Sequence, residues 1–221
     1  MNDRETISIS TGNTKMGDIP SVSLPPIITC QEHVPCARDG RCYVIKHMKF
    51  GTVVRAFSKN YRIYLEDPQR YFSQIKGYLL FYEPEYFRYH VGGDIPDQEY
   101  FDRIKALCLE VPEVKFMLMT KCYMDKHYYE WRAEGEEGSP KKRSIELTCG
   151  VMPSNLSIII SAWPGYPIPA DLRERFPIAY MDDGNEPRIT AADFVCHNHC
   201  DSCHYCWAAK KTRKNVVFPL H

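Results

Sequence analysis

The sequence lacks a hydrophobic segment long enough to cross a lipid bilayer. Its longest apolar run lies around residues 156–163, whereas a transmembrane helix needs about 20 apolar residues. The chain also lacks net charge, because 28 acidic and 28 basic side chains cancel, so no global field draws it to nucleic acid or to a membrane. No cationic and apolar leader opens it, and we expect no secretory signal. We therefore expect a cytoplasmic protein whose thiols stay reduced.

Internal repeats and long low-complexity tracts are also missing. With 221 residues, 44% of them hydrophobic, the chain can form one domain, or one domain with a small appendage. Ten cysteines stand out against this ordinary composition. In a reducing compartment they are better explained as metal ligands and core residues than as disulfides.

Four cysteines fall within eleven residues near the C-terminus, in the segment CHNHCDSCHYCW. They are Cys196, Cys200, Cys203 and Cys206. Gaps of three, two and two residues allow one short loop to place four thiolates around a single metal centre. Such spacing favours a 4Fe–4S cluster, with zinc as the alternative. Either way all coordination positions are filled, so the site is structural or carries electrons.

Three further cysteines, Cys30, Cys36 and Cys42, are spaced more loosely, with five residues between neighbours. Three thiolates leave one iron of a cubane free for a substrate or cofactor, which is the property of a catalytic metal site. Two alternatives stay open here. One or two of these cysteines are simply buried, or they complete one site with the C-terminal group.

The pattern of elements predicts an α/β fold. Expected helices cover residues 43–61, 68–83 and 97–111, with Pro68 and Asp97 at helix starts. Expected strands are 86–91, 114–120, 156–161 and 177–181, most of them continuous apolar runs that are typical of buried parallel strands. Strands alternating with helices indicate a partial (β/α) barrel with mostly parallel strands.

Three regions follow from this pattern. Residues 1–29 are polar and rich in Gly and Pro, and we expect an extended N-terminal arm. Residues 30–195 form the partial barrel. Residues 196–221 form a cysteine-rich metal-binding segment with a basic tail.

Polar residues follow the expected parallel strands, where α/β proteins place ligands and chemistry. Candidate catalytic residues are His90 and Lys121, although a core position is as good an explanation for His90. Candidate cofactor-binding residues are Gly92, Gly93, Asp94 and Ser161. The Gly pair permits close approach of a ligand to the backbone, but it also simply makes a turn.

The order of several segments resembles the bacteriophage gene product 88 family. These are STGNTKMGDIPSVSLPPIITC, the spaced cysteines, FRYHVGGDI, VPEVKFMLMTK and the C-terminal CHNHCDSCHYCW. The resemblance covers about residues 10–207. That family occurs in phages and their bacterial hosts, which implies the host cytoplasm, and it has no settled activity to carry over.

More distantly, the chain is similar to radical S-adenosylmethionine enzymes. This similarity implies that Cys30, Cys36 and Cys42 hold a cluster that binds S-adenosylmethionine, that the Gly92–Asp94 turn holds its methionine amino group, and that the C-terminal cysteines hold an auxiliary cluster. It also implies a reductant protein as partner and a radical reaction on an unknown substrate. The spacing departs from the usual motif, whose gaps are three and two residues.

Two other hypotheses compete with this enzyme. In one, zinc or a closed cluster stabilises the fold of a non-catalytic protein that binds a host protein or nucleic acid. In the other, the chain is an electron-transfer or redox-sensing module. Neither the substrate nor the oligomeric state can be deduced from the sequence.

Overall fold

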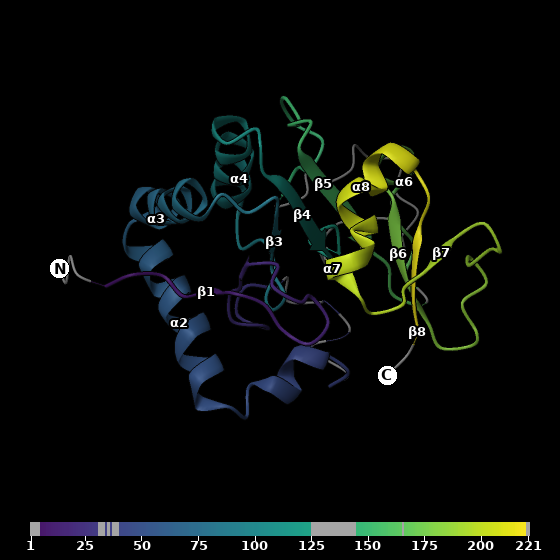
Figure 1. The fold of residues 1–221 in the computed structure, drawn as a ribbon. Helices are drawn as coiled ribbons and strands as arrows, with labels where there is room; N and C mark the ends of the chain where they lie inside the picture. The colour runs from purple at the N-terminus through teal and green to yellow at the C-terminus, as the bar shows by residue number, and fades with distance from the viewer. Residues whose placement is uncertain are drawn as a thin grey trace, which may run out of the picture.

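The computed structural model describes residues 5–30, 34, 36, 40–124, 145–164 and 166–219. These residues form a mixed α/β fold around one sheet of eight strands, in the order β1-β2-β3-β4-β5-β6-β8-β7 (Figure 1). The strands are β1 (Ile9–Ser10), β2 (Ser21–Val22), β3 (Tyr86–Tyr89), β4 (Lys115–Thr120), β5 (Leu156–Ser161), β6 (Ile178–Asp182), β7 (Phe194–Val195) and β8 (Val216–Pro219). The helices are η1 (Tyr43–His47), α2 (Gly51–Glu66), α3 (Pro68–Tyr82), α4 (Gln98–Glu110), α6 (Ala170–Arg175), α7 (Cys200–Cys203) and α8 (Tyr205–Thr212).

The sheet is parallel except for β1, which pairs antiparallel with β2. From β2 to β6 the strands follow one another in space in the same order as along the chain. Doubly wound sheets reverse their strand order at a switch point, whereas barrels add each new strand beside the last. The order therefore confirms a mostly parallel α/β sheet. Its closure into a barrel is not shown, and the partial barrel stays a prediction.

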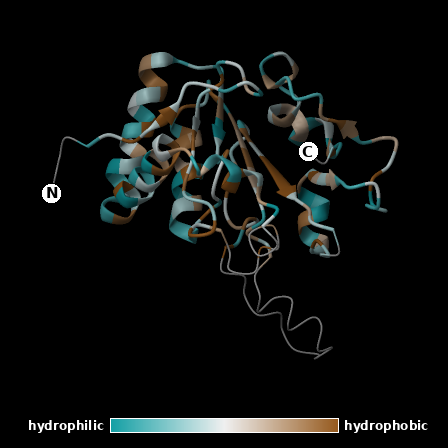
Figure 2. Cartoon of the chain, turned by 90° about the horizontal axis from the view of Figure 1, so that it is seen from below, coloured by the Kyte–Doolittle hydropathy of each residue, from teal (hydrophilic) through white to brown (hydrophobic). Residues whose placement is uncertain are grey.

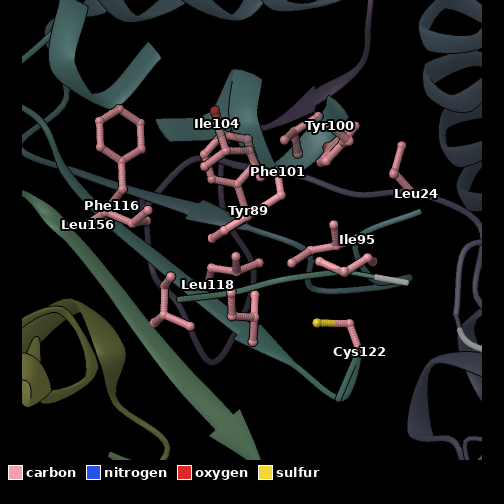
Figure 3. Close-up of a cluster of buried hydrophobic side chains, with 14 of the residues drawn as sticks. Leu24, Tyr89, Ile95, Tyr100, Phe101, Ile104, Phe116, Leu118, Cys122 and Leu156 are labelled. Atoms are coloured by element: carbon pink, nitrogen blue, oxygen red, sulfur yellow. The ribbon is translucent and has the colours of Figure 1, made fainter. Parts of the chain in front are cut away.

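Successive side chains of the strands point to opposite faces of the sheet and pack into two different layers. On β4, Phe116 and Leu118 belong to the large core that includes Phe101 and Ile104 of α4, as Figure 3 shows. The intervening Met117 packs with Trp207 of α8 instead. Helix α4 thus lies on one side of the sheet and α8 on the other, where it packs against β4 and β5. Hydrophobic residues concentrate along the strands between these layers (Figure 2).

The best-defined elements confirm the sequence prediction. Helix α3 begins after Asp67, whose side chain accepts a hydrogen bond from the backbone N–H of Arg70, and α4 begins after Asp97 in the same way. The helix expected over residues 43–61 is wrong as one element. It divides into η1 and α2 because Phe50 has an extended backbone and Gly51, a poor helix former, follows it.

Both ends of the chain contribute to the sheet. Strand β2 lies in the segment expected as an arm, and its Val22 is buried beside β3. Strand β8 lies after the basic residues of the tail and pairs with β6. The terminal segments are therefore integral to the fold. Among the described residues, no helix has the length and apolarity needed to cross a membrane.

Candidate functional site

Cys30, Cys36 and Cys42 gather beyond the carboxyl end of β2. The loop that carries them leaves β2, the first strand of the parallel series, and Cys42 immediately precedes η1. The thiols of Cys36 and Cys42 form a hydrogen bond, and Cys30 lies close enough for its charge to act on both. The structure thus pairs Cys36 with Cys42 and places Cys30 within reach of their charges, but the three side chains as described do not form a metal-holding group. We call them the N-terminal cysteine group.

The Gly92-Gly93 turn after β3 holds this loop in place. A Cβ on Gly93, whose φ is +77°, would lie 2.6 Å from the carbonyl oxygen of Leu24, and one on Gly92 would lie 2.6 Å from Phe57. The carbonyl of Gly92 also accepts a hydrogen bond from the backbone N–H of Leu24 at 3.0 Å. The space beside these glycines is filled by the chain itself. Leu24 and Thr29 approach Gly93 closely, and Phe57 and Val44 approach Gly92, whereas ligand binding by these glycines stays a prediction.

Asp94 ties this turn to the end of β4. Its Oδ1 accepts from Thr120 Oγ1 at 2.6 Å and from the N–H of Ile95 at 2.8 Å, and its Oδ2 accepts from the N–H of Lys121 at 2.8 Å. Burial raises the pKa of this carboxyl group, and the hydrogen bonds oppose that shift. Oδ2 retains one further acceptor position, since a carboxylate oxygen has two lone pairs.

Lys121 extends from β4 to the end of β5. Its Nζ donates to Ser161 Oγ at 2.6 Å and lies 5.9 Å from the ring centre of Trp163. Arg41, which precedes Cys42, lies 5.1 Å from the same ring. Trp163 is thus flanked by two cations. The positive charge of Lys121 favours the thiolate form of each cysteine in the N-terminal cysteine group, although stronger influences raise the pKa values of Cys30 and Cys36.

The three thiols differ sharply in acidity. A hydrogen bond from Cys36 is the largest cause that lowers the pKa of Cys42 to about 6, and backbone N–H groups of Val44 and Ile45 assist. The same hydrogen bond raises the pKa of Cys36. Burial, followed by the charge of Asp94, raises the pKa of Cys30 to about 12. Cys42 is therefore a thiolate at neutral pH, when its neighbours are thiols.

His90 occupies the core rather than the site opening. It is 3% exposed, and its Nε2 lies 3.1 Å from the hydroxyl of Tyr100. Burial lowers the pKa of this imidazole to about 3, so it is neutral. Its Nδ1 is buried without a hydrogen-bond partner. The core interpretation of His90 thus agrees with its position.

The four C-terminal cysteines form a second group, on the face of the sheet that α8 covers. Cys200 and Cys206 pack against Met16, Met117 and Trp207. The carbonyl of Cys206 accepts from Ser157 Oγ of β5 at 2.8 Å. Burial raises the pKa of Cys206 to about 12 and raises that of Cys200 as well, and charges on the other thiols of the group contribute. We call Cys196, Cys200, Cys203 and Cys206 the C-terminal cysteine group.

The two groups are separate, because they belong to different parts of the core. Cys30 and Cys36 pack against the large core on the α4 side. Cys196, Cys200 and Cys206 pack against the smaller clusters beneath α8. The two groups thus pack in different hydrophobic clusters, and whether they hold one metal site or two stays a prediction.

The donor chemistry of both groups suits iron–sulfur clusters or zinc, which prefer thiolate ligands. As the described side chains lie, no three or more His, Cys, Asp or Glu residues stand in a metal-holding arrangement. A bound metal would therefore draw the thiols of either group closer together.

Sequence reasoning missed several residues of the site. Thr120 and Trp163 could have been predicted as site residues, because each stands at or just beyond the end of a strand. Thr29 accepts from the N–H of Asp94 at 3.2 Å, and nothing in its local sequence indicates this. Arg88 is a charged residue inside an apolar strand, and it is buried.

A model of the family described as Gene product 88 matches residues 2–138. The matched span contains the N-terminal cysteine group, the Gly92–Asp94 turn and Lys121, and ends before the C-terminal cysteine group. No curated protein and no solved structure matches the chain. Since the match covers more than half of the sequence, this chain belongs to the bacteriophage gene product 88 family.

Proposed function

We propose that this protein is an iron–sulfur enzyme whose N-terminal cysteine group holds an open 4Fe–4S cluster that binds S-adenosylmethionine. One observation carries the proposal. The three cysteines lie in the loop after the first parallel strand, and Leu24 and Thr29 of the same loop contact the Gly92–Asp94 turn of the next strand. This is where parallel α/β sheets place their chemistry. A partial barrel is the fold that we propose with it.

Cys30, Cys36 and Cys42 would hold the cluster, which would supply the one-electron reduction that cleaves S-adenosylmethionine into methionine and a 5′-deoxyadenosyl radical. The chain's own residues provide charge and position. Lys121 compensates the thiolates and is itself held by Ser161. Asp94 Oδ2 offers an acceptor for an amino group beside the Gly92-Gly93 turn. The electron requires a reductant protein as partner, and the substrate is unknown.

The C-terminal cysteine group is proposed as a second, closed centre, with a 4Fe–4S cluster or zinc. Four thiolates complete the coordination of either, so no substrate binds to its metal. Its place on the face of the sheet, covered by α8, suits a structural or electron-carrying centre.

Anaerobic reconstitution with iron and sulfide tests the enzyme. We expect the double variant Cys36→Ser, Cys42→Ser to lose about four irons relative to the parent chain, together with binding of S-adenosylmethionine measured by calorimetry. The parent chain should release 5′-deoxyadenosine after reduction with dithionite. Purification with zinc alone, and no heat of binding, would overturn the proposal.

A second candidate is a redox-sensing dithiol, favoured by the hydrogen bond between Cys36 and the Cys42 thiolate. A low-molecular-weight disulfide such as oxidised glutathione would be attacked by Cys42, releasing one glutathione thiol. Cys36 would then displace the second glutathione, leaving a protein disulfide. Mass spectrometry of the metal-free protein after this treatment should show the Cys36–Cys42 disulfide; mixed disulfides alone would exclude it.

A further inference from the structure

Arg88 is a buried cation on β3 that lacks an anionic partner. It is 8% exposed, and no Asp or Glu of the described residues forms an ion pair with it. Its Nε has no hydrogen-bond partner, and its Nη1 meets only the weak acceptor Met16 Sδ, at 3.7 Å. The hydroxyl of Tyr43 makes a further contact. Because a buried guanidinium without an anion is strongly unfavourable, this arrangement indicates that negative charge is supplied from elsewhere.

The C-terminal cysteine group lies on the side of the sheet to which Arg88 points. Phe87 and Tyr89 face the large core, so Arg88 faces the opposite side. Met16, which contacts Arg88, packs against Cys200 and Cys206. The guanidinium of Arg88 lies close enough to Cys200 and Cys206 for its charge to act on both. Arg88 is therefore placed to stabilise thiolates in this group.

The segment around Lys15 brings a second positive charge to the same place. The carbonyl of Lys15 accepts from the N–H of Cys200 at 2.9 Å, and the ammonium charge of Lys15 lies close enough to act on Cys200. Gly17 lies so close to Asp201 that a Cβ would come within 2.5 Å of that side chain. The N-terminal segment thus closes over the C-terminal cysteine group and adds charge of the same sign as Arg88.

We propose that Arg88 is the internal counter-cation of a metal–thiolate centre at the C-terminal cysteine group. The inference rests on the second metal centre proposed above. Protonated thiols are neutral, whereas four thiolates around zinc or a 4Fe–4S cluster carry net negative charge. A fixed guanidinium favours the loaded state over the empty one, and the loaded centre gives Arg88 its missing anion. Arg88 acts on the centre through charge and is no ligand.

Anaerobic titration with Co²⁺ tests this role. The parent for the comparison is the full chain with Ser at positions 30, 36 and 42, so that the tetrathiolate absorption reports the C-terminal cysteine group alone. We expect Arg88→Met to weaken Co²⁺ binding by roughly 10- to 100-fold, as loss of outer-shell partners does. Arg88→Lys keeps the charge and should stay within about threefold. Arg55→Met, which removes an exposed charge on α2, should leave binding unchanged.

Thermal unfolding of the metal-free proteins separates this role from simple packing. Removing an unpaired buried charge should leave Arg88→Met at least as stable as its parent, whereas a purely structural arginine would lower the Tm when removed. Either a lower metal-free Tm or unweakened Co²⁺ binding in Arg88→Met would overturn the role of Arg88 while leaving the second centre intact. A parent that gives no tetrathiolate spectrum would overturn the second centre, and the inference with it.

Discussion

The two cysteine groups have the same ligand chemistry and opposite surroundings. The N-terminal cysteine group lies at the carboxyl edge of the sheet, where burial raises the pKa of Cys30 and a hydrogen bond from Cys36 lowers the pKa of Cys42. The C-terminal cysteine group lies on a face of the sheet, among Met and Trp side chains, where burial raises thiol pKa values and Arg88 opposes the rise. The proposed roles follow this difference: the group at the sheet edge is proposed for chemistry, and the group on the covered face for a closed centre.

The largest expected effect is on metal content. Replacing Cys36 and Cys42 with Ser should abolish S-adenosylmethionine cleavage, because the open cluster loses two of its three ligands. The matched variant, Cys200→Ser with Cys206→Ser, should keep S-adenosylmethionine binding. Iron analysis and calorimetry on both variants measure the contrast. Equal loss of binding in the two variants would mean that the groups are not independent.

The Gly92-Gly93 turn offers a way to disturb one group through the backbone. Gly93→Ala should destabilise the fold by roughly 1–3 kcal/mol, because φ is +77° and the Cβ would collide with Leu24. Gly77→Ala is the control: no atom lies within 4 Å of its Cβ position in α3, so it should be neutral or stabilising by up to about 1 kcal/mol. Urea unfolding measures both. A Gly93→Ala protein as stable as Gly77→Ala would show that the loop packs less closely than described.

Thiol acidity sharpens the comparison further. In the metal-free, reduced protein, Cys42 should be alkylated by iodoacetamide at a rate that rises with pH through about pH 6, because its pKa is lowered to about 6. Below that pH the thiol is protonated and unreactive. Cys206, whose pKa burial raises to about 12, should stay unmodified up to pH 9. Lys121→Met removes a positive charge and should move the Cys42 profile to higher pH. Mass spectrometry of peptides follows each cysteine, and matching profiles for Cys42 and Cys206 would contradict the account.

The smallest effect concerns the face of the sheet. Ser157→Ala removes the hydrogen bond from Ser157 Oγ to the carbonyl of Cys206 and should cost about 1 kcal/mol of unfolding free energy. The Cys42 alkylation profile should not change, because Ser157 contacts the other cysteine group. A shift in that profile would reveal coupling between the two groups.

The sequence predicted what depends on strong local signals. Strand β5 was expected at residues 156–161 because a continuous apolar run marks it, and α4 was expected because Asp97 caps it. The two-residue strand β2 carries no such run, so its place in the sheet could not be predicted. Strand β8 was not predicted, because it follows the basic residues of the tail in the sequence and was assigned to that tail.

For the site, the spacing of Cys30, Cys36 and Cys42 in the sequence was enough to predict the N-terminal cysteine group. Its supports were harder to predict. The hydrogen bonds of Thr29 and Thr120 to the Asp94 segment join residues far apart in the chain, and such contacts follow only from the arrangement of the strands. The unpaired charge of Arg88 could be recognised only from the structure, because it depends on which face of β3 the side chain lies on and on the position of α8.

The most direct test of the open cluster is electron paramagnetic resonance of the reconstituted, dithionite-reduced chain in which all four cysteines of the C-terminal cysteine group are Ser. The account predicts a 4Fe–4S signal that changes shape when S-adenosylmethionine is added and disappears on further substitution of Cys42. A signal that S-adenosylmethionine leaves unchanged, or no cluster signal at all, would contradict it.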